Sequence, residues 1–298
     1  MRSANIARIG GYDFLYMKTR VGNKKKVILY HADCPDGFGA AWAAWKKFGS
    51  RAAYIPVEYQ MPPPRGLRGK EIYLVDFSYP YPTLAKLNRS SKKLAIIDHH
   101  ISAKAAVLKF PHLFALGHSG AVLSWKYFHP KKKIPRLLRY VEDTDLWRFR
   151  IPKTREVSSF LGLYPFDFRL WDSFARDFED AKRRVEWIRT GAIVLRYESR
   201  LVQRLVKNAK LVRFEGIKAY VLNASVLHSE LGHALVQKLP PLGIVWSEKD
   251  GTLRVSLRSD GKLDVSKIAA RYGGGGHRAA AGFSIPFKKG FPWKDIKK

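Results

Sequence analysis

The sequence predicts an α/β protein in which a parallel-sheet N-terminal domain is joined by a long helix to a smaller α+β C-terminal domain. The first observation is a set of three short, uninterrupted apolar runs, Val27–Tyr30, Ile72–Val75 and Leu94–Ile97. Such runs are typical of strands that are buried on both faces, as in a parallel sheet. The second observation is helical spacing between these runs, which indicates βαβ units. The third is a change of pattern at residue 181, where a long amphipathic segment begins.

Local patterns predict the remaining elements of the N-terminal domain. Alanine and aromatic residues at helical spacing, closed by Gly49, predict a helix over 38–49. Ser119 stands where the N-cap of a helix over 121–128 is expected. We further expect strands over 53–57 and 113–116, a loop over 61–66, a short helix after Pro82, and a helix over 134–141 that ends before Glu142.

The second half of the chain begins with a connector helix, expected over 181–210, whose mostly apolar stripe recurs every three or four residues. A β-rich part follows. We expect strands over 219–222, 243–246 and 253–257, a hairpin turn at Asp250-Gly251, a helix over 265–270 and a closing strand at Phe283. The expected domains are an N-terminal extension over 1–23, a catalytic domain over 24–180, and a second domain with a basic tail over 211–298.

The chain carries a strong positive charge. Its 298 residues contain 55 Lys and Arg against 25 Asp and Glu, a formal net charge of +30. A field of this sign favours polyanions, with nucleic acid as the first class of partner and anionic membranes as a second. The alternative is that the charge reflects the general composition of proteins in its source. A hydrophobic content of 46% is that of a globular protein.

Cysteine content and the N-terminal residues bear on location. The single cysteine, Cys34, excludes an internal disulfide framework and suits a reducing compartment, so we expect a cytoplasmic protein. No apolar run approaches the roughly 18–20 residues that span a bilayer, and we expect no membrane partner. Residues 1–16 lack the apolar core of a secretory signal. They are either a basic presequence or, as we prefer, an extension ahead of a start at Met17.

Metal-binding side chains follow the ends of the three buried strands. His31, Asp33 and Asp36 follow the first strand, Asp76 follows the second, and Asp98-His99-His100 ends the third. Open α/β sheets place their sites at the carboxyl ends of strands. A single Asp here would equally well cap a turn, and a lone His is more often a packed residue. Together with Asp143, however, these residues indicate a constellation.

This set of ligands predicts two divalent cations. A carboxylate shared by two cations about 3.5–4 Å apart, with His and Asp as outer ligands, can activate water and hold a phosphoryl oxygen. Oxygen ligands favour magnesium or manganese, and the imidazoles favour manganese. We do not expect a structural zinc site, because only Cys34 could supply a thiolate.

These residues carry a resemblance to a known family. The motifs His31…Asp33…Asp36-Gly37, Val75-Asp76, Asp98-His99-His100, Asp143-Thr144 and Gly273–His277 stand in the order seen in DHH-family phosphoesterases that have a DHH-associated C-terminal domain. The chain is similar in particular to the branch of bacterial oligoribonucleases, or nanoRNases, and nucleotide phosphodiesterases. The similarity covers roughly residues 27–285.

The resemblance implies a role for each residue. His31, Asp33 and Asp76 would hold one metal, Asp76, His99 and Asp143 the other, and Asp36 would be shared into the cluster and act in catalysis. His100 would face the substrate phosphate, and Asp98 would orient the histidine pair. A substrate-binding loop would be formed by Arg258, Ser259, Gly274, Gly275, Gly276 and His277.

The first motif departs from the family pattern. Its two aspartates usually stand one residue apart, and here Cys34-Pro35 separates Asp33 from Asp36. Asp36 keeps its place beside Gly37, so Asp33 is the less secure ligand. We expect Cys34 to pack in the loop, and Asp145 to be secondary to Asp143.

The predicted function is two-metal phosphodiester hydrolysis, in which an exonuclease releases mononucleotides from short oligonucleotides. The expected partners are short single-stranded RNA or DNA, or nucleotides, and the preference between RNA and DNA stays open, as does a homodimer. The alternatives are a small-nucleotide phosphatase, a cyclic mono- or dinucleotide phosphodiesterase, or a non-catalytic nucleic-acid-binding protein on the same scaffold.

Overall fold

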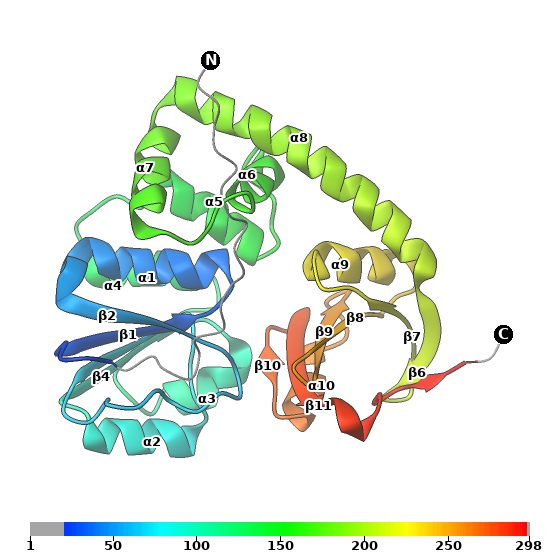
Figure 1. The fold of residues 1–298 in the computed structure, drawn as a ribbon, viewed down its shortest axis with the longest axis horizontal. Helices are drawn as coiled ribbons and strands as arrows, with labels where there is room; N and C mark the ends of the chain where they lie inside the picture. The colour runs from blue at the N-terminus through cyan, green and yellow to red at the C-terminus, as the bar shows by residue number, and fades with distance from the viewer. Residues whose placement is uncertain (1–20, 297–298) are drawn as a thin grey trace.

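The N-terminal domain is built around a five-stranded sheet in a computed structural model that describes residues 21–296 (Figure 1). The expected extension at 1–16 and the start at Met17 lie outside the described residues. All pairs in the sheet are parallel and the strand order is β2-β1-β3-β4-β5. The strands are β1 (Lys26–His31), β2 (Ala52–Val57), β3 (Glu71–Val75), β4 (Lys93–Asp98) and β5 (His112–Phe114).

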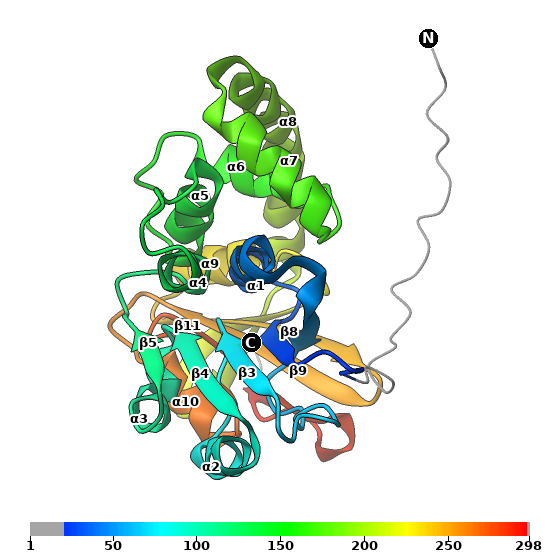
Figure 2. The ribbon, with the colours of Figure 1, turned by 90° about the vertical axis from the view of Figure 1, so that its left-hand side faces the viewer.

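Helices cover both faces of this sheet, as the uninterrupted apolar strands predict. α1 (Pro35–Phe48) and α4 (Gly120–Phe128) lie on one face, and α2 (Tyr81–Ser90) and α3 (Lys104–Val107) lie on the other (Figure 2). Ile28 and Ile97 belong to the apolar core on the α1 side, whereas Leu29 and Ile96 belong to the core on the opposite side. Alternate residues of one strand thus enter two different cores.

A helical layer stands over the α1 side of the sheet. It contains α5 (Arg136–Asp145), α6 (Thr154–Leu161) and α7 (Phe168–Glu179). The buried side chains of Phe160, Trp171 and Phe178 belong to the same core as α1. α5 differs from the expected helix, because it continues four residues beyond Val141 and takes Asp143 and Asp145 into its last turn.

The long helix α8 (Ala181–Leu205) connects the two domains (Figure 1). It has 25 residues, and Gly191 is its one buried residue. The expected helix over 181–210 ends earlier, at Leu205, and a 3₁₀ turn, η4 (Val206–Asn208), follows. The other 3₁₀ turns are η2 (Gly49–Arg51), η3 (Ile101–Ala103) and η5 (Phe287–Lys289).

No helix among residues 21–296 is both long and apolar enough to cross a membrane.

The C-terminal domain contains a seven-stranded mixed sheet with the order β10-β11-β9-β8-β7-β6-β12. β7 and β8 are parallel, and the other pairs are antiparallel. The strands are β6 (Lys210–Phe214), β7 (Ile217–Asn223), β8 (Leu242–Lys249), β9 (Thr252–Ser259), β10 (Gly275–Gly276), β11 (Ala280–Pro286) and β12 (Lys294–Asp295). α10 (Val265–Arg271) packs into one core and α9 (His228–Lys238) into another. The sequence pattern did not predict α9 or β6.

The C-terminal domain contacts the loops at the carboxyl ends of the first sheet. Gln60 donates its side-chain N–H to the carbonyl of Tyr272, and its amide oxygen accepts from Ser284 N–H, both at 3.1 Å. Arg254 forms an ion pair with Glu58 at 3.0 Å. These contacts place the second sheet opposite the strand ends that carry the predicted ligands.

Candidate active site

Most of the predicted ligands lie together beside a cleft between the two domains. β1 ends at His31, β3 is followed by Asp76, and β4 ends at Asp98 with His99 and His100 directly after it. The pairing of β1, β3 and β4 as parallel neighbours brings these three ends to the same edge of the sheet. The cleft has a volume of about 660 Å³ and is also lined by side chains of α9, β9 and β11.

Asp76 lies at the centre of the cluster. Its carboxylate is buried, with Oδ1 at 3.1 Å from His99 Nε2 and Oδ2 at 3.7 Å from His31 Nδ1. Burial alone would raise the pKa of Asp76, but the interactions with His31 and His99 hold it well below its ordinary value. The residue has φ = 54°, a left-handed conformation that Asp and Asn adopt more readily than other side chains. A strained residue at a strand end is typical of functional sites.

Asp36 is held by the beginning of α4. It lies in the first turn of α1, and its carboxylate accepts hydrogen bonds from Gly120 N–H at 2.6 Å and Ala121 N–H at 3.0 Å. A Cβ at position 120 would lie 2.4 Å from Asp76 Cβ, so glycine permits this approach. Asp36 Oδ2 is also 3.5 Å from His99 Nε2. Burial and the charges of Asp76 and Asp145 raise the pKa of Asp36 well above its usual range.

Asp98 fixes the position of His100. Its Oδ1 accepts hydrogen bonds from the backbone N–H of His99 at 2.7 Å and of His100 at 3.3 Å, and lies 2.7 Å from His100 Nδ1. Burial alone would lower the pKa of His100, and the neighbouring Asp98 raises it. This is the arrangement expected of a carboxylate that orients a functional histidine from behind.

Asp143 lies apart from the cluster, and this corrects the predicted ligand. Its carboxylate accepts from Arg150 N–H at 3.0 Å, Ile151 N–H at 2.9 Å and the Thr154 hydroxyl at 2.6 Å. The cluster is joined instead by Asp145, whose Oδ2 is 3.6 Å from His99 Nε2. Both residues belong to α5, where residues two apart point about 200° away from each other. Burial and the charge of Asp76 raise the pKa of Asp145.

The cluster fits a centre for divalent cations. Asp36, Asp76 and Asp145 surround His99, and their charges repel one another without a cation. The buried atoms Asp145 Oδ2 and His99 Nδ1 have no hydrogen-bond partner among the described residues. Burial alone would lower the pKa of His99, but Asp76, Asp145 and Asp36 raise it to about 10. One donor set that could hold a metal ion is Asp36, Asp76 and His99, and another is His31, Cys34 and Asp76, so Asp76 belongs to both.

The loop after β1 contains Asp33, the less secure of the predicted ligands, and Cys34. Asp33 has an exposed side chain and φ = 51°, and it lines the cleft without joining either donor set. Cys34 was expected to pack in the loop, and its thiol lies within 4.8 Å of ligand atoms of His31 and Asp76. Burial and the carboxylates of Asp76, Asp145 and Asp36 raise the pKa of this thiol well above its ordinary value. In the sequence, the feature that sets Cys34 apart is its position between Asp33 and Asp36 of the first motif.

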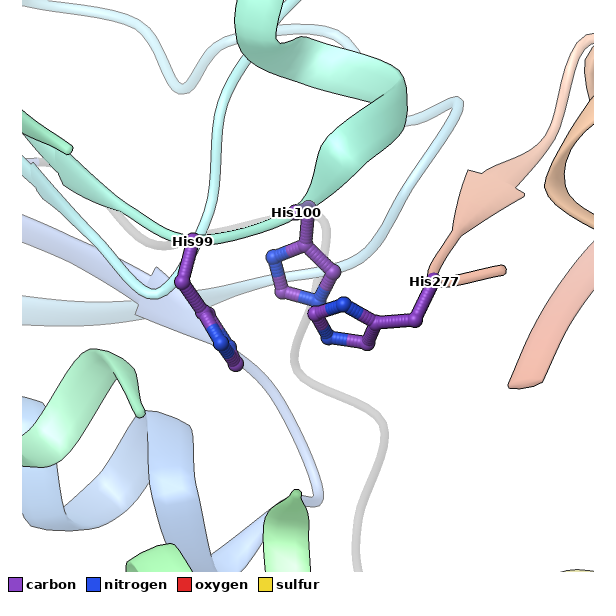
Figure 3. A group of neighbouring side chains, drawn as sticks. All are labelled: His99, His100 and His277. Carbon is purple, nitrogen blue, oxygen red and sulfur yellow. The ribbon is translucent and has the colours of Figure 1, made fainter. Parts of the chain in front are cut away.

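The glycine loop of the C-terminal domain reaches the histidines of the first domain. The His277 ring stacks on His100, with centroids 4.5 Å apart and an interplanar angle of 25°, and its centroid lies 4.6 Å from that of His99 (Figure 3). Gly276 N–H donates to the Ser102 hydroxyl at 3.0 Å, a further contact between the glycine loop and the N-terminal domain. Burial and the nearby His100 and His99 lower the pKa of His277 to about 2.

The other residues predicted to bind substrate differ in whether they line the cleft and in what their side chains contact. Arg258 lines the cleft and its guanidinium donates to the Ser229 hydroxyl at 2.8 Å; burial lowers its pKa to about 10. Ser259 also lines the cleft, but its hydroxyl donates to the Leu263 carbonyl in a turn. Gly275 and Gly276 form β10 and line the cleft, whereas Gly274 packs beside Phe283. Sequence reasoning missed α9, which brings Ser229 and His233 to the cleft.

Two aromatic residues that could stack on a base, Trp147 and Tyr272, lie in different surroundings. Trp147 lines the cleft, with its ring 5.5 Å from that of His233. Tyr272 stacks on Phe283 at 4.3 Å and donates its hydroxyl to Glu215, so it belongs to the packing of the second domain.

Comparisons with known proteins bear on the family of the chain. A family model described as the DHHA1 domain matches residues 227–292. The uncharacterised protein R106 of Acanthamoeba polyphaga mimivirus is 32% identical, over 92% of this chain and 71% of that protein. Together with the Asp98-His99-His100 motif at the end of β4, the DHHA1 match assigns the family. The chain belongs to the DHH family of phosphoesterases. Its C-terminal part carries the DHHA1 domain.

Two further relatives extend the comparison. Oligoribonuclease NrnB of Bacillus subtilis is 47% identical over 66 residues, which are 22% of this chain and 16% of NrnB. A solved DHH domain, from a protein described as a member of a family of ribosomal proteins, superposes with a TM-score of 0.56 at 15% identity, over 88% of this chain and 82% of that one. The second match shows a shared fold. Membership of the DHH family places the chain among phosphoester hydrolases.

Proposed function

We propose that this protein is a divalent-metal-dependent phosphodiesterase that removes mononucleotides from one end of short oligonucleotides. The observation that carries the proposal is a cluster in which Asp36, Asp76 and Asp145 surround the buried His99. The three carboxylates line a cleft that Arg258 and His277 line from the other domain. Acidic ligands on one wall and cationic or neutral donors on the other suit a phosphodiester that bridges the two domains.

In this proposal the N-terminal domain binds the metal ions and the C-terminal domain binds the substrate. Asp36, Asp76, His99 and Asp145 would hold one of two divalent cations, and Asp76 would reach the second beside His31. When bound, two cations lower the pKa of water and offset negative charge on phosphoryl oxygens. Asp98 keeps the His100 ring in place, so that its other nitrogen, Nε2, can face a substrate oxygen. Arg258 supplies a cationic fork for a phosphate next to the one that is cut.

The cleft favours small substrates. Its volume of about 660 Å³ lies within the range of small-ligand pockets, roughly 300–1,000 Å³. The contacts of Ser102 and Gln60 with the C-terminal domain narrow the space for a long duplex. The partial match to a protein named oligoribonuclease supports a nucleotide chain as the substrate, and the net charge of +30 supports a polyanion.

The small size of the cleft also favours a second candidate, a phosphodiesterase or phosphatase of small linear or cyclic nucleotides. The two candidates are separated by the products and by the length dependence of the rate. A non-catalytic nucleic-acid-binding role has less support, because the carboxylate cluster retains its donors.

Asp76→Asn tests the proposed centre. The full chain is incubated with manganese or magnesium and with RNA and DNA from dinucleotides to two dozen nucleotides, and products are separated by chromatography. The wild type should release mononucleotides fastest from the shortest chains and lose activity with a chelator. Asp76→Asn should abolish turnover, because the residue belongs to both donor sets.

Asparagine tolerates the left-handed backbone at position 76, so circular dichroism should show a folded variant. A folded variant that keeps a tenth of the wild-type rate at saturating manganese contradicts the bridging role. Equal rates on cyclic dinucleotides and on linear chains would favour the second candidate.

A further inference from the structure

Cys34 lies within a donor set that differs chemically from the rest of the cluster. The ligand atoms of His31, Cys34 and Asp76 lie within 4.8 Å of one another. Zinc-type bonds of about 2.1 Å to nitrogen or oxygen and about 2.3 Å to sulfur place two ligands of one tetrahedral ion about 3.4–3.6 Å apart. A movement of about an ångström therefore brings all three donors onto one ion.

The backbone fixes the thiol in this position. Cys34 is the N-cap residue of α1, and its carbonyl accepts from Phe38 N–H at 2.9 Å, but its side chain makes no capping hydrogen bond. At Gly37 a Cβ would lie 2.1 Å from the His31 carbonyl oxygen, so the loop returns closely against the end of β1. This turn brings the thiol next to the imidazole that ends β1.

The surroundings of the thiol are those of a ligand rather than of a core residue. Its neighbours Asp36, Asp76 and Asp145 are carboxylates, and Cys34 itself lines the cleft. Three protein donors leave one position of a tetrahedral ion free for water or substrate, as in catalytic zinc sites. Asp76 joins this set to Asp36 and His99, so both sets belong to one centre.

We propose that the Cys34 thiolate is a metal ligand, and that His31, Cys34 and Asp76 form a soft site beside the harder site of Asp36, Asp76 and His99. Thiolate donors select zinc, cobalt or iron(II) over magnesium, whereas carboxylate donors favour manganese and magnesium. The centre would therefore bind two different classes of cation, and the thiol proton would pass to solvent. The inference deepens the proposed function, because it concerns the same centre.

Cobalt(II) gives a direct test, because thiolate coordination produces a charge-transfer absorption in the near ultraviolet that oxygen and nitrogen ligands do not produce. Cys34 is the one cysteine in the sequence, so such a band has a single source among thiols. The full chain without substrate should develop the band on titration and reach saturation at one cobalt per chain. Cys34→Ser and Cys34→Asp should both lack the band.

Cys34→Asp separates the ligand role from a structural role. A carboxylate restores a charged donor, so this variant should still bind metal. Its preference for zinc over manganese should fall roughly 10- to 100-fold, the size of effect typical of changes around a metal site. Asp33→Asn is the matched control from the same loop, and it should keep the band because its exposed side chain lies outside the donor set.

A measurement on the wild type covers the case in which a variant fails to fold. Zinc should slow alkylation of Cys34 by iodoacetamide by at least an order of magnitude, because the ligand sulfur is no longer free to react. No charge-transfer band with excess cobalt, or alkylation at the same rate with and without zinc, overturns the inference. Hydrolysis without the band would refute this inference alone, and the band without hydrolysis would refute the proposed function alone.

Discussion

Asp143 and Asp145 show how two residues of one short motif can have different roles. Asp145 lies 3.6 Å from His99, whereas Asp143 accepts hydrogen bonds from two backbone N–H groups and from Thr154. We expect Asp145→Asn to weaken manganese binding and leave stability nearly unchanged. Asp143→Asn should lower the free energy of unfolding by about 1–3 kcal/mol, because its amide N–H₂ would face other donors.

Urea unfolding of the metal-free protein and manganese titration measure the two effects. Each variant is the control for the other, since both replace one carboxylate in the same turn. A stable Asp143→Asn protein that no longer binds manganese would return Asp143 to the ligand set.

At the residue scale, the sequence predicted the site residues that follow strand ends. It did not predict which residues of a helix face the site. Asp98-His99-His100 could be placed because the end of a buried strand determines where the next residues lie. The choice between Asp143 and Asp145 depends on where α5 ends, and helix ends are the least certain feature of a sequence pattern. Cys34 was expected to pack in its loop, because a thiol is usually a packing residue.

His277 tests whether the C-terminal domain recognises the substrate. Its ring stacks on His100, but it enters from the other domain. Binding energy from groups remote from the cut phosphate orients that phosphate, so its loss appears in kcat as well as KM. His277→Ala should lose roughly 10- to 100-fold in kcat/KM on a dinucleotide, about 1.4–2.7 kcal/mol.

A small chromogenic phosphodiester without nucleoside groups is the control substrate. On this ester His277→Ala should stay within a few-fold of the wild type, whereas His100→Ala should fail on both substrates. Equal losses of His277→Ala on both would place His277 with the metal centre instead of the substrate groups.

At the scale of elements, the parallel sheet was the most predictable part and α9 the least. The strands β1, β3 and β4 are buried on both faces, so their apolar runs have no alternative interpretation at this length. α9 begins with His228 and contains Gly232 and His233, which interrupt a simple apolar stripe. Its apolar side chains Leu231 and Leu235 are buried because β7 and β8 lie beneath them, a tertiary contact without a local signal.

The packing of α4 on α1 should make stability depend on pH through His129. Its Nε2 donates to the Ala43 carbonyl at 2.9 Å, and burial together with Lys132, Lys47 and Lys46 lowers its pKa. The folded state therefore binds fewer protons here than the unfolded state. The stability that His129 contributes is complete above its unfolded pKa of about 6.5 and is lost as the pH falls below that value.

His129→Gln isolates this effect, because the glutamine amide can donate to the same carbonyl but does not titrate. The free energy of unfolding of the wild type should fall more steeply than that of the variant as the pH falls through the slightly acidic range. Parallel curves in chemical unfolding experiments would mean that His129 does not change its protonation on unfolding.

At the scale of the whole molecule, the two domains enclose the cleft and α8 joins them, while much of the positive charge lies outside the cleft. Arg196, Arg200 and Arg204 are exposed and spaced four residues apart on α8, so they share one side of the helix that joins the domains (Figure 1). A dinucleotide can fill the cleft without reaching such a surface. A longer strand that leaves the cleft has further phosphates available for it.

This arrangement predicts a salt dependence that grows with substrate length. Each phosphate that a basic side chain neutralises in a single-stranded complex adds about 0.7 to the slope of log affinity against log salt. The KM for a chain of twenty nucleotides should therefore rise more steeply with salt than the KM for a dinucleotide. Replacing Arg196, Arg200 and Arg204 together by glutamine should lower the slope for the long chain and leave the dinucleotide slope unchanged, which makes the dinucleotide the internal control. Equal slopes for both substrates would instead mean that the excess of 55 basic over 25 acidic residues has no part in substrate capture and reflects the general composition of proteins in the source.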